Sequence, residues 1–440
     1  MPHPATLAAL LLASLSLAAP VTAQISEAPT DTAVSAEEPA DALTLLRPAY
    51  HFGQTLYTMA KRRAEAPALN TLIYQTLPND PRPLGLARPN ADLLHAAAWL
   101  DLSAGPVILT LPPTLAGRYH SIAITNMETN ILALLGTRTG SQGGRFALIN
   151  SAYQGPLPED ASPLRLACNS CRLVARILRK GPEDEVLAAE ALAGITLEAD
   201  PATMIAPSPV KQNPDAATWL ETINTIIAGE GEASALSQKA SLLKGLAEAE
   251  DAWSAALPTL ESELKDSLAD TFDQVNGWAY PRFMIGDTAA DDLFRAQMSE
   301  NAPDALPRVE AMEIQTSENA EGEPLDGTNA YRLRLPYNLP VGGFWSVTMY
   351  QIGTNGSLEL VPNEYNRFAV GDRSDHLRAD RNGSVELFIQ ATKPEGERSV
   401  NWLPAPKGRF ALLFRAYLPK SEMLDGSFRL TAVTKAEPIP

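Results

Sequence analysis

The sequence has few of the residues and motifs that would reveal a chemistry directly. It contains two cysteines and five histidines among 440 residues. A GxSxG nucleophile turn, a GxxxxGK(S/T) phosphate loop, a GxGxxG turn after a strand and an HExxH metal motif are all absent. Beyond residue 23 the histidines are His51, His95, His120 and His376, and no two of them stand at ligand spacing. We therefore expect no metal site and no cofactor, and the reaction or ligand stays open.

Long hydrophobic runs are also missing beyond residue 23, so we expect no membrane span in the mature chain. Residues 7–19 form a short apolar run, and Val21-Thr-Ala23 is a small-residue cleavage site, which predicts a secretory signal over residues 1–23. The segment before this run lacks the usual Lys or Arg. Residues 24–41 are rich in Ala, Ser, Thr, Pro and acids and predict a flexible leader. We expect a periplasmic or secreted protein.

Basic residues are too few to balance the acidic ones, and the formal net charge is −17. This charge argues against a nucleic-acid partner, whose phosphates would be repelled. An apolar content of 45% indicates a globular chain, and 440 residues are too many for one ordinary core. Two domains are the expected organisation.

The two cysteines lie close together, as Cys168 and Cys171 in Cys-Asn-Ser-Cys. In an oxidising compartment this pair predicts a local disulfide. Arg172 follows Cys171 where c-type haem attachment would need His, and a single CxxC is a poor zinc signal. Strand-like flanks favour a structural disulfide over redox chemistry, which is the alternative.

Short apolar runs separated by Gly and Pro predict a first β-rich domain over residues 42–200. It begins with a helix over residues 42–66 whose spacing is interrupted by Pro48 and Gly53. A helix is also expected to start at Pro182-Glu-Asp-Glu-Val. The expected strands are 93–102, 107–111, 119–125, 131–135, 145–149 and 173–178.

Residues 201–310 are expected to hold a Pro-rich linker and a helical module. Trp219, Ile223 and Ile226 share one helix face, and a second stripe runs from Leu257 to Val275. The C-terminal domain, residues 311–440, is expected to be a sandwich or jelly roll with strands 331–335, 341–350, 357–361, 367–370, 384–389 and 409–417. Asn355-Gly356 and Asn382-Gly383 are hairpin signals. The predicted fold class is mainly β with a helical linker (α+β), with two antiparallel β domains.

The candidate ligand-binding residues combine planar arginine forks, amides and aromatic faces, which suit a carboxylate, phosphate or sugar. In the first domain they are Arg88, Asn90, Trp99, Arg118, Tyr119 and Arg138. In the second they are Trp345, Asp372, Arg373, Asn401 and Trp402, the last in a Pro-rich loop that would present its ring. The alternative is that Asn90 and Asp92 cap turns, that the arginines pair structurally, and that Trp402 closes the end of the sandwich.

A basic group, Arg172, Arg176, Arg179 and Lys180, is unusual in so acidic a chain. It is suited to an anionic ligand, although a solvated strand edge protected by charge is the simpler interpretation. Candidates for acid–base catalysis are Asp92, Asp101 and His95. No spacing fixes two carboxylates at a working distance, and His95 also fits a structural role in a sheet.

Several motifs resemble a bacterial exported-protein family of paired domains of unknown function, DUF 1254 followed by DUF 1214. The first module is carried by Arg88-Pro-Asn-x-Asp, Ala98-Trp-Leu-Asp-Leu, Arg118-Tyr-x-Ser and Lys180-Gly-Pro-Glu-Asp. The second is carried by Phe344-Trp-Ser-Val-Thr-Met-Tyr, Gly371-Asp-Arg, Asn401-Trp-Leu-Pro-Ala-Pro and Leu424-Asp-Gly. The resemblance covers roughly residues 45–430. It implies two jelly-roll-like modules with helices between them, and no settled activity.

The leading functional hypothesis is an exported two-domain protein that binds a polar small molecule or a glycan, because arginines, amides and tryptophans occur without a nucleophile–base set. One alternative is a hydrolase or lyase that uses Asp and His for acid–base chemistry. Another is a structural component of the cell envelope that assembles through its sheet edges. The oligomeric state is left open.

Overall fold

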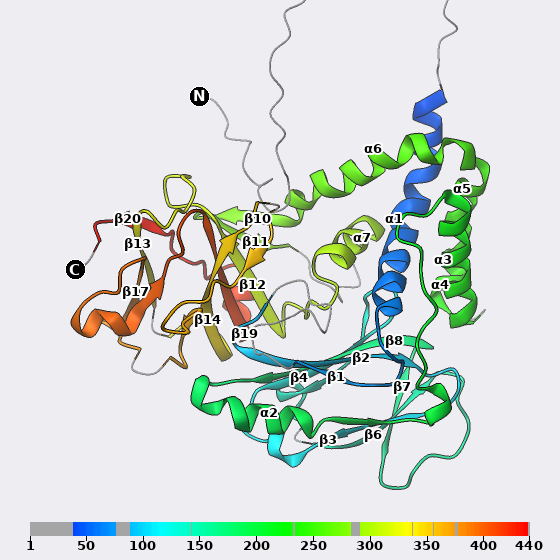
Figure 1. Cartoon of the computed structure of the whole chain (residues 1–440), viewed down its shortest axis with the longest axis horizontal. Coiled ribbons are helices and arrows are strands. Elements are labelled where there is room, and N and C mark those ends of the chain that lie inside the picture. Colours follow the sequence, from blue (N-terminus) through cyan, green and yellow to red (C-terminus); the bar gives the residue numbers. More distant parts are fainter. Residues whose placement is uncertain are drawn as a thin grey trace, which may run out of the picture.

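The computed structural model contains two β modules and a layer of helices, which meet around a central sheet (Figure 1). It describes residues 38–75, 89–141, 143–231, 234–282, 291–336, 338–354, 356–374 and 377–438. The predicted signal 1–23, most of the leader and Arg88 lie outside these residues. Helix α1 begins at Glu38, inside the predicted leader.

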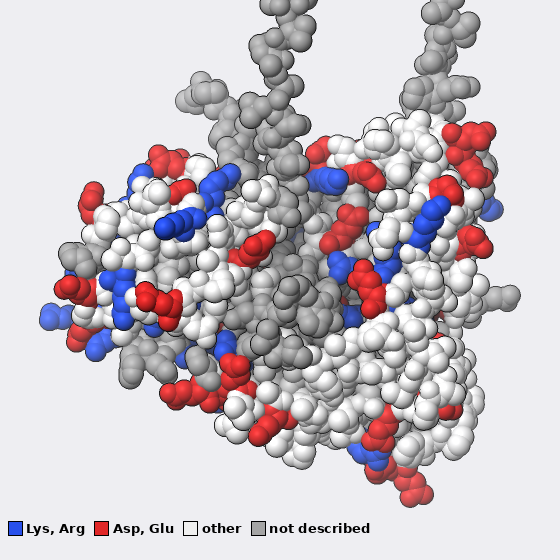
Figure 2. Space-filling view, in the orientation of Figure 1, with Lys and Arg blue, Asp and Glu red and all other residues white. Residues whose placement is uncertain are grey.

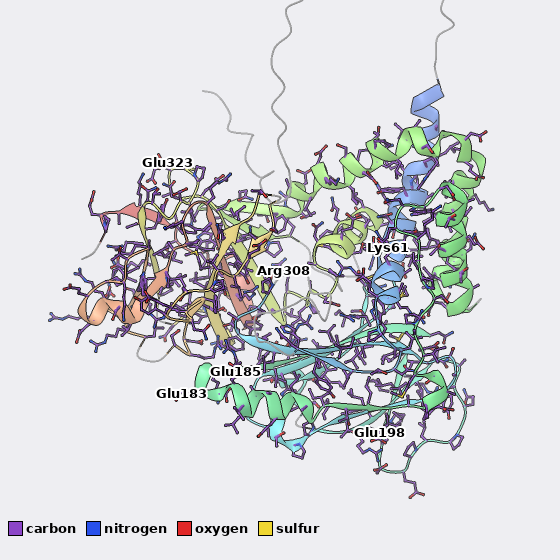
Figure 3. All side chains as sticks on the ribbon, viewed as in Figure 1. Lys61, Glu183, Glu185, Glu198, Arg308 and Glu323 are labelled. Carbon is purple, nitrogen blue, oxygen red and sulfur yellow. A yellow bond between two sulfur atoms is a disulfide. The ribbon has the colours of Figure 1, made fainter. Side chains whose placement is uncertain are left out.

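The N-terminal β module consists of two packed sheets. The five-stranded sheet has the order β1 (Ile73–Tyr74), β2 (Leu93–Asp101), β8 (Ser170–Leu178), β4 (His120–Thr125) and β5 (Ile131–Gly136). The four-stranded sheet has the order β7 (Ser162–Leu166), β6 (Gly144–Asn150), β3 (Val107–Leu111) and β9 (Thr196–Glu198). Helix α2 (Glu185–Ala193) starts behind Pro182 as expected, with Glu183 and Glu185 at its beginning (Figure 3).

The five-stranded sheet is buried on both faces. Along β2, Leu94, Ala96 and Leu100 join the core between the two sheets, because side chains alternate across a strand. The intervening residues face the helices and the C-terminal module, and the central part of both β2 and β8 is buried throughout. This sheet is therefore the middle layer of the molecule.

The helical layer is built from segments that precede and follow the N-terminal module in the sequence. It contains α1 (Glu38–Ala64), α3 (Ala216–Glu230), α4 (Ala235–Lys239), α5 (Lys244–Glu248) and α6 (Trp253–Asp266), and α7 (Asp292–Asn301) packs against α1. The predicted interruption of the first helix is wrong, because α1 continues through Pro48 and Gly53. The stripe predicted to end at Val275 also ends earlier, since β10 (Phe272–Val275) is a strand.

The C-terminal module is a second pair of packed sheets. One sheet contains β10, β11 (Trp278–Pro281), β12 (Ala311–Thr316), β19 (Phe410–Pro419), β14 (Val341–Ile352) and β15 (Leu358–Glu359), and β16 (Ala369–Gly371) also pairs with β14. The other contains β18 (Trp402–Pro404), β17 (Ser384–Gln390), β13 (Ala330–Pro336) and β20 (Thr434–Ala436). The short helix α8 (Ser421–Leu424) follows β19.

The predicted class, mainly β with a helical segment, is confirmed, with three differences in detail. The pairs β6–β7 and β17–β18 are parallel, so the modules are not purely antiparallel. Strands β10 and β11, inside the range expected to be linker and helices, pair into the C-terminal sheet. Asn382-Gly383 lies in a tight turn before β17, but β17 pairs with β13 and β18 and not with the strand before it, so this hairpin is wrong. Asn355 lies outside the described residues.

Cys168 and Cys171 form a disulfide, and both are buried in the core of the N-terminal module. In the part of the chain that the structure describes, no helix is both long and apolar enough to cross a bilayer. On the face seen in Figure 2, acidic and basic side chains are interspersed over the helical layer and the C-terminal module, while the N-terminal module shows few charges.

Packing explains why a glycine stands at position 53, in the middle of α1. A Cβ atom on Gly53 would lie 2.2 Å from Cη2 of Trp219, whose ring also stacks on Tyr50 and lies against Trp253. The missing side chain thus lets α3 approach α1 closely.

We predict that Gly53→Ala lowers the free energy of unfolding by about 1–3 kcal/mol, because the clash with Trp219 outweighs the better helix propensity of Ala. The matched control is Gly229→Ala in α3, where a Cβ would meet nothing within 4 Å. This control should raise stability by up to about 1 kcal/mol. Urea unfolding measures both, and an equal gain from the two changes would contradict the packing argument.

Candidate functional site

The polar residues of the middle sheet lie on the face that meets the helices and the C-terminal module. His95 on β2 is paired in register with Arg176 on β8, and Trp99 is paired with Arg172. Arg172 also lies over the Trp99 ring, with its guanidinium carbon 5.3 Å from the ring centroid. Strand alternation therefore sets arginines in rows on one face of this sheet.

These arginines are not at a solvated edge, so that interpretation of the basic group is wrong. Strand β8 lies between β2 and β4, and Arg172, Arg176 and Arg179 are 7%, 6% and 8% exposed. Their partners come from other segments. Arg172 forms an ion pair with Asp304, which follows α7, and Arg179 forms one with Glu185 (labelled in Figure 3).

The two β modules are joined by a buried ion pair between Asp92 and Arg373, whose oxygen and nitrogen are 2.8 Å apart. Ser346 on β14 donates a second hydrogen bond to Asp92 at 2.5 Å. Burial opposes ionisation of Asp92, but the charges of Arg373 and Arg415 outweigh it, and its pKa lies below the usual 3.8. Asp92 is thus held as a carboxylate that fixes the modules together.

An aromatic cluster of Tyr119, Phe344 and Tyr417 lies beside this ion pair. Phe344 and Tyr417 stack with centroids 4.0 Å apart, and Tyr119 meets both edge-on at 5.3 Å. Tyr119 donates a hydrogen bond to the buried carboxylate of Glu310 at 2.8 Å. Burial raises the pKa of both groups, so this contact is a structural link between the modules.

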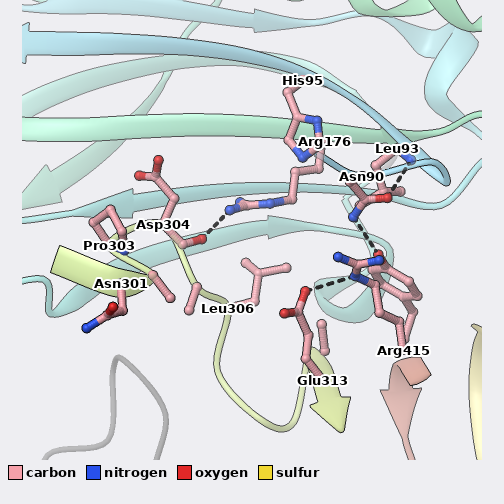
Figure 4. A pocket seen from close by; sticks show the side chains of 14 residues that line it. Asn90, Leu93, His95, Arg176, Asn301, Pro303, Asp304, Leu306, Glu313 and Arg415 are labelled. Atoms are coloured by element: carbon pink, nitrogen blue, oxygen red, sulfur yellow. Dashed lines mark hydrogen bonds and ion pairs between the residues drawn. The ribbon is translucent and has the colours of Figure 1, made fainter. Parts of the chain in front are cut away.

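A small cavity of about 100 Å³, called the chamber below, lies on one side of the aromatic cluster, and Figure 4 shows the side chains that line it. Its walls come from β2, β8, β12, β19 and residues 301–306 at the end of α7 and just beyond it, and its polar lining includes Asn90, His95, Arg176, Asp304, Arg415 and Tyr417. Burial, together with the charge of Arg176, lowers the pKa of His95 to about 3. His95 is therefore an uncharged wall of this chamber near neutral pH.

An open pocket of about 480 Å³ lies on the other side of the cluster, again between the modules. Tyr119, Phe344, Leu178 and Leu418 provide its apolar lining, and its polar lining includes Arg118, His120, Lys180, Asp372 and Arg373. Four predicted ligand-binding residues, Arg118, Tyr119, Asp372 and Arg373, thus meet in one cavity although they are more than 250 positions apart across the two modules.

The two arginines of the open pocket are already oriented by carboxylates. Arg118 forms a bidentate ion pair with Asp184, with nitrogen–oxygen distances of 2.5 and 2.7 Å, and Arg373 forms an ion pair with Asp92. The Arg373 guanidinium also lies 4.0 Å from the centroid of Phe344. His120 is fixed between the carbonyl oxygens of Arg118 and Ser141, each 2.9 Å from a ring nitrogen.

The other predicted ligand-binding residues that the structure describes do not line the open pocket, although Trp345 donates its main-chain N–H to Asp372. Trp99 and Trp345 are buried, at 3% exposure each. The Asn401 side chain accepts a hydrogen bond from the main-chain N–H of Arg378 and donates to the carbonyl oxygens of Arg378 and Glu386. Trp402 is 1% exposed and donates its indole N–H to the carbonyl of Gln390, so the expected presentation of its ring by a loop is wrong. Arg138 reaches the Glu310 carboxylate at 3.6 Å.

The three candidate catalytic residues are not brought together. Asp92 is engaged by Arg373 and Ser346, and Asp101 at the far end of β2 accepts hydrogen bonds from Ser103. These two residues are nine positions apart along extended chain, which is about 30 Å. His95, between them, has its Nδ1 atom 3.2 Å from Gln75. This arrangement supplies no acid–base pair.

Sequence reasoning missed Asp304, Glu310, Arg415 and Tyr417. Arg415 carried a usable signal, because it interrupts the apolar run of a central strand, and such a charge must be paired. It donates to Glu313, Thr348 and Tyr350. Asp304 and Glu310 lie in the connection between α7 and β12, where no periodicity marks them.

Two models of known protein families match parts of this chain. Residues 69–198 match the model described as "Protein of unknown function (DUF1254)", and residues 310–421 match "Protein of unknown function (DUF1214)". The chain belongs to the family that joins these two modules. Both cavities lie where the DUF1254 module meets the DUF1214 module, and the paired arrangement expected from the sequence motifs is confirmed.

Two solved structures are similar to this chain to different degrees. The VPA0106 protein from Vibrio parahaemolyticus is 23% identical with a TM-score of 0.71, and the match covers 90% of this chain and 100% of that chain. This likeness shows the same overall fold. An uncharacterized protein from Burkholderia cenocepacia is 13% identical with a TM-score of 0.45, over 92% of this chain and 91% of that chain. No curated protein matches the sequence.

We predict that Asp92→Asn lowers the free energy of unfolding by about 3 kcal/mol at neutral pH, because it removes the direct partner of the largely buried Arg373, whose other carboxylate neighbour, Asp372, is 3.7 Å away. The pKa of Asp92 is depressed on folding, so its stabilisation is present above about pH 4 and is lost as the pH falls through the folded-state value. The difference from wild type should therefore shrink in acid.

The control for this change is Asp380→Asn, which breaks an exposed pair with Arg334. Exposed pairs contribute about 0–1 kcal/mol, so this variant should unfold close to wild type. Urea titrations between pH 3 and 7 compare the three proteins. Equal, pH-independent losses in both variants would count against a joining role for Asp92.

Proposed function

We propose that this chain binds a small organic anion in the open pocket between its two modules. The single observation that supports this most is that Arg118, Tyr119, Asp372 and Arg373, predicted separately from the sequence, line one cavity. A volume of about 480 Å³ lies in the range of small-molecule sites, which are about 300–1,000 Å³. Neither module alone supplies all of these walls.

The lining of the open pocket suggests a ligand with an apolar body and a negative group. Tyr119, Phe344 and Leu418 offer apolar contact area, while Lys180 projects an exposed ammonium at the rim. Among the residues that the structure describes, Lys180 has no side-chain hydrogen bond or ion pair, in contrast to Arg118 and Arg373. Lys180 is therefore the cation available to a ligand.

The geometry favours an anion over a glycan. Recognition of a sugar usually needs an accessible aromatic face beside polar groups, and none of Trp99, Trp345 and Trp402 lines the open pocket. It also gives little support to the hydrolase or lyase alternative, since Asp92, His95 and Asp101 act with separate partners.

We also propose that the protein works in the periplasm or outside the cell. The buried disulfide between Cys168 and Cys171 is compatible with an oxidising compartment. Fractionation of cells that express the full chain with a C-terminal tag tests this, and recovery of unprocessed protein in the cytosol alone would refute it.

We predict that Lys180→Glu weakens binding of the best ligand roughly tenfold or more, which is 1.4 kcal/mol per factor of ten, because a repulsive charge replaces the free cation. Isothermal titration against a panel of carboxylates, phosphates and anionic sugars measures it. The side chain is exposed, so folding should be unaffected.

Lys265→Glu is the matched control, since Lys265 is also exposed but lies on α6, away from the pocket. It changes the net charge equally and should leave affinity unchanged. Equal losses in both variants would indicate a general effect of net charge, and no binding across the panel would refute the proposal.

A further inference from the structure

The chamber contains a buried cation with an unused donor. Arg176 is 6% exposed, and its Nη2 group donates to the main-chain carbonyl of Asp304. Its Nη1 atom is buried and has no hydrogen-bond partner among the described residues. Burial lowers the pKa of Arg176, which reflects the cost of keeping this guanidinium charged inside the protein.

A buried donor without an acceptor is costly, and a ligand that supplies an acceptor removes that cost. We propose that the chamber is a second binding site, for a small, planar, singly charged oxyanion of the short-carboxylate class, held by Arg176. The planar guanidinium fork matches a carboxylate in shape and charge.

A second donor faces the same chamber. The Tyr417 hydroxyl oxygen accepts a hydrogen bond from Asn90 at 3.1 Å, and its own hydrogen has no acceptor among the described side chains. Burial raises the pKa of Tyr417, so the phenol stays protonated and is able to donate. Arg176 and Tyr417 thus offer one N–H and one O–H to a ligand.

The charges around the chamber indicate one negative charge for the ligand. Arg415 is matched by Glu313 at 3.0 Å, and Asp304 is matched by Arg172 at 3.3 Å (Figure 4 shows the first pair). His95 is uncharged. Arg176 is left with only a main-chain carbonyl as its direct partner.

The size of the chamber limits the ligand further. About 100 Å³ is smaller than the roughly 150 Å³ of engineered cavities that hold benzene, so the chamber admits only a few heavy atoms. No residue lines both the chamber and the open pocket, so this site is independent of the function proposed above.

The test uses sodium acetate and sodium formate as probes and sodium chloride at equal ionic strength as the reference. Binding to the folded state raises the unfolding temperature with ligand concentration. We expect a saturable rise with acetate or formate in the wild-type chain, and at least a tenfold higher apparent dissociation constant in Arg176→Met. Arg179→Met, which removes a buried arginine just after the end of β8 and outside the chamber, should keep the wild-type response.

A second variant covers the case in which Arg176→Met does not fold. Ala311→Leu keeps every charge but fills the chamber from β12, and it should also abolish the response. Lys180→Glu should leave it unchanged, which separates this site from the open pocket. The proposal is overturned if wild type responds no more to acetate and formate than to chloride, or if the response survives in both Arg176→Met and Ala311→Leu.

Discussion

The burial of β8 on both faces is the constraint on which the rest of the structure depends. One face of this strand completes the core of the N-terminal sandwich, and the other carries Arg172 and Arg176 into the interior of the molecule. A guanidinium cannot lose its charge there, so each arginine needs partners from elements that arrive later in the chain. The segment around Asp304, between α7 and β12, supplies them.

The need to pair buried charges also explains how the two modules are oriented. Asp92 at the start of β2 is buried only because Arg373 and Ser346 of the C-terminal module meet it. Replacing a buried ion pair with apolar residues is often neutral or stabilising, so such a pair is weak evidence of stability. It does fix geometry, since any other docking angle would leave Asp92 and Arg373 unpaired. Tyr350 adds a bond of 2.6 Å to the carbonyl of Pro89 at the same junction.

Much of the fold was predictable from local patterns. The strands expected at 107–111 and 131–135 agree with β3 and β5 to within one residue, because turns made by Gly and Pro delimit them sharply. Gly53 shows where this reasoning ends. Gly53 leaves room for the ring of Trp219, which lies 166 positions later in the chain, so no local sequence pattern could reveal its role. The short edge strands β7 and β18 pair in parallel for the same reason, since their partners are set by tertiary contacts.

The candidate site was predictable by residue type more than by place. Arginines and aromatics were predicted from residue type, yet Trp402 is buried, and the three arginines of the basic group lie in the interior, away from a solvated sheet edge. Sequence cannot tell a solvated strand from a central one when both faces of the sheet are covered, because the alternation of polar and apolar residues looks alike in both.

The positions of the two cavities follow from the polar residues of the junction. Apolar side chains pack to close density, whereas charged groups must keep the distances and angles of their own pairs. The aromatic cluster of Tyr119, Phe344 and Tyr417 fills the middle of the junction, and the ion pairs of Asp92, Arg118 and Arg415 hold its flanks apart. Space therefore remains on both sides of the cluster, beside groups that can bind an anion.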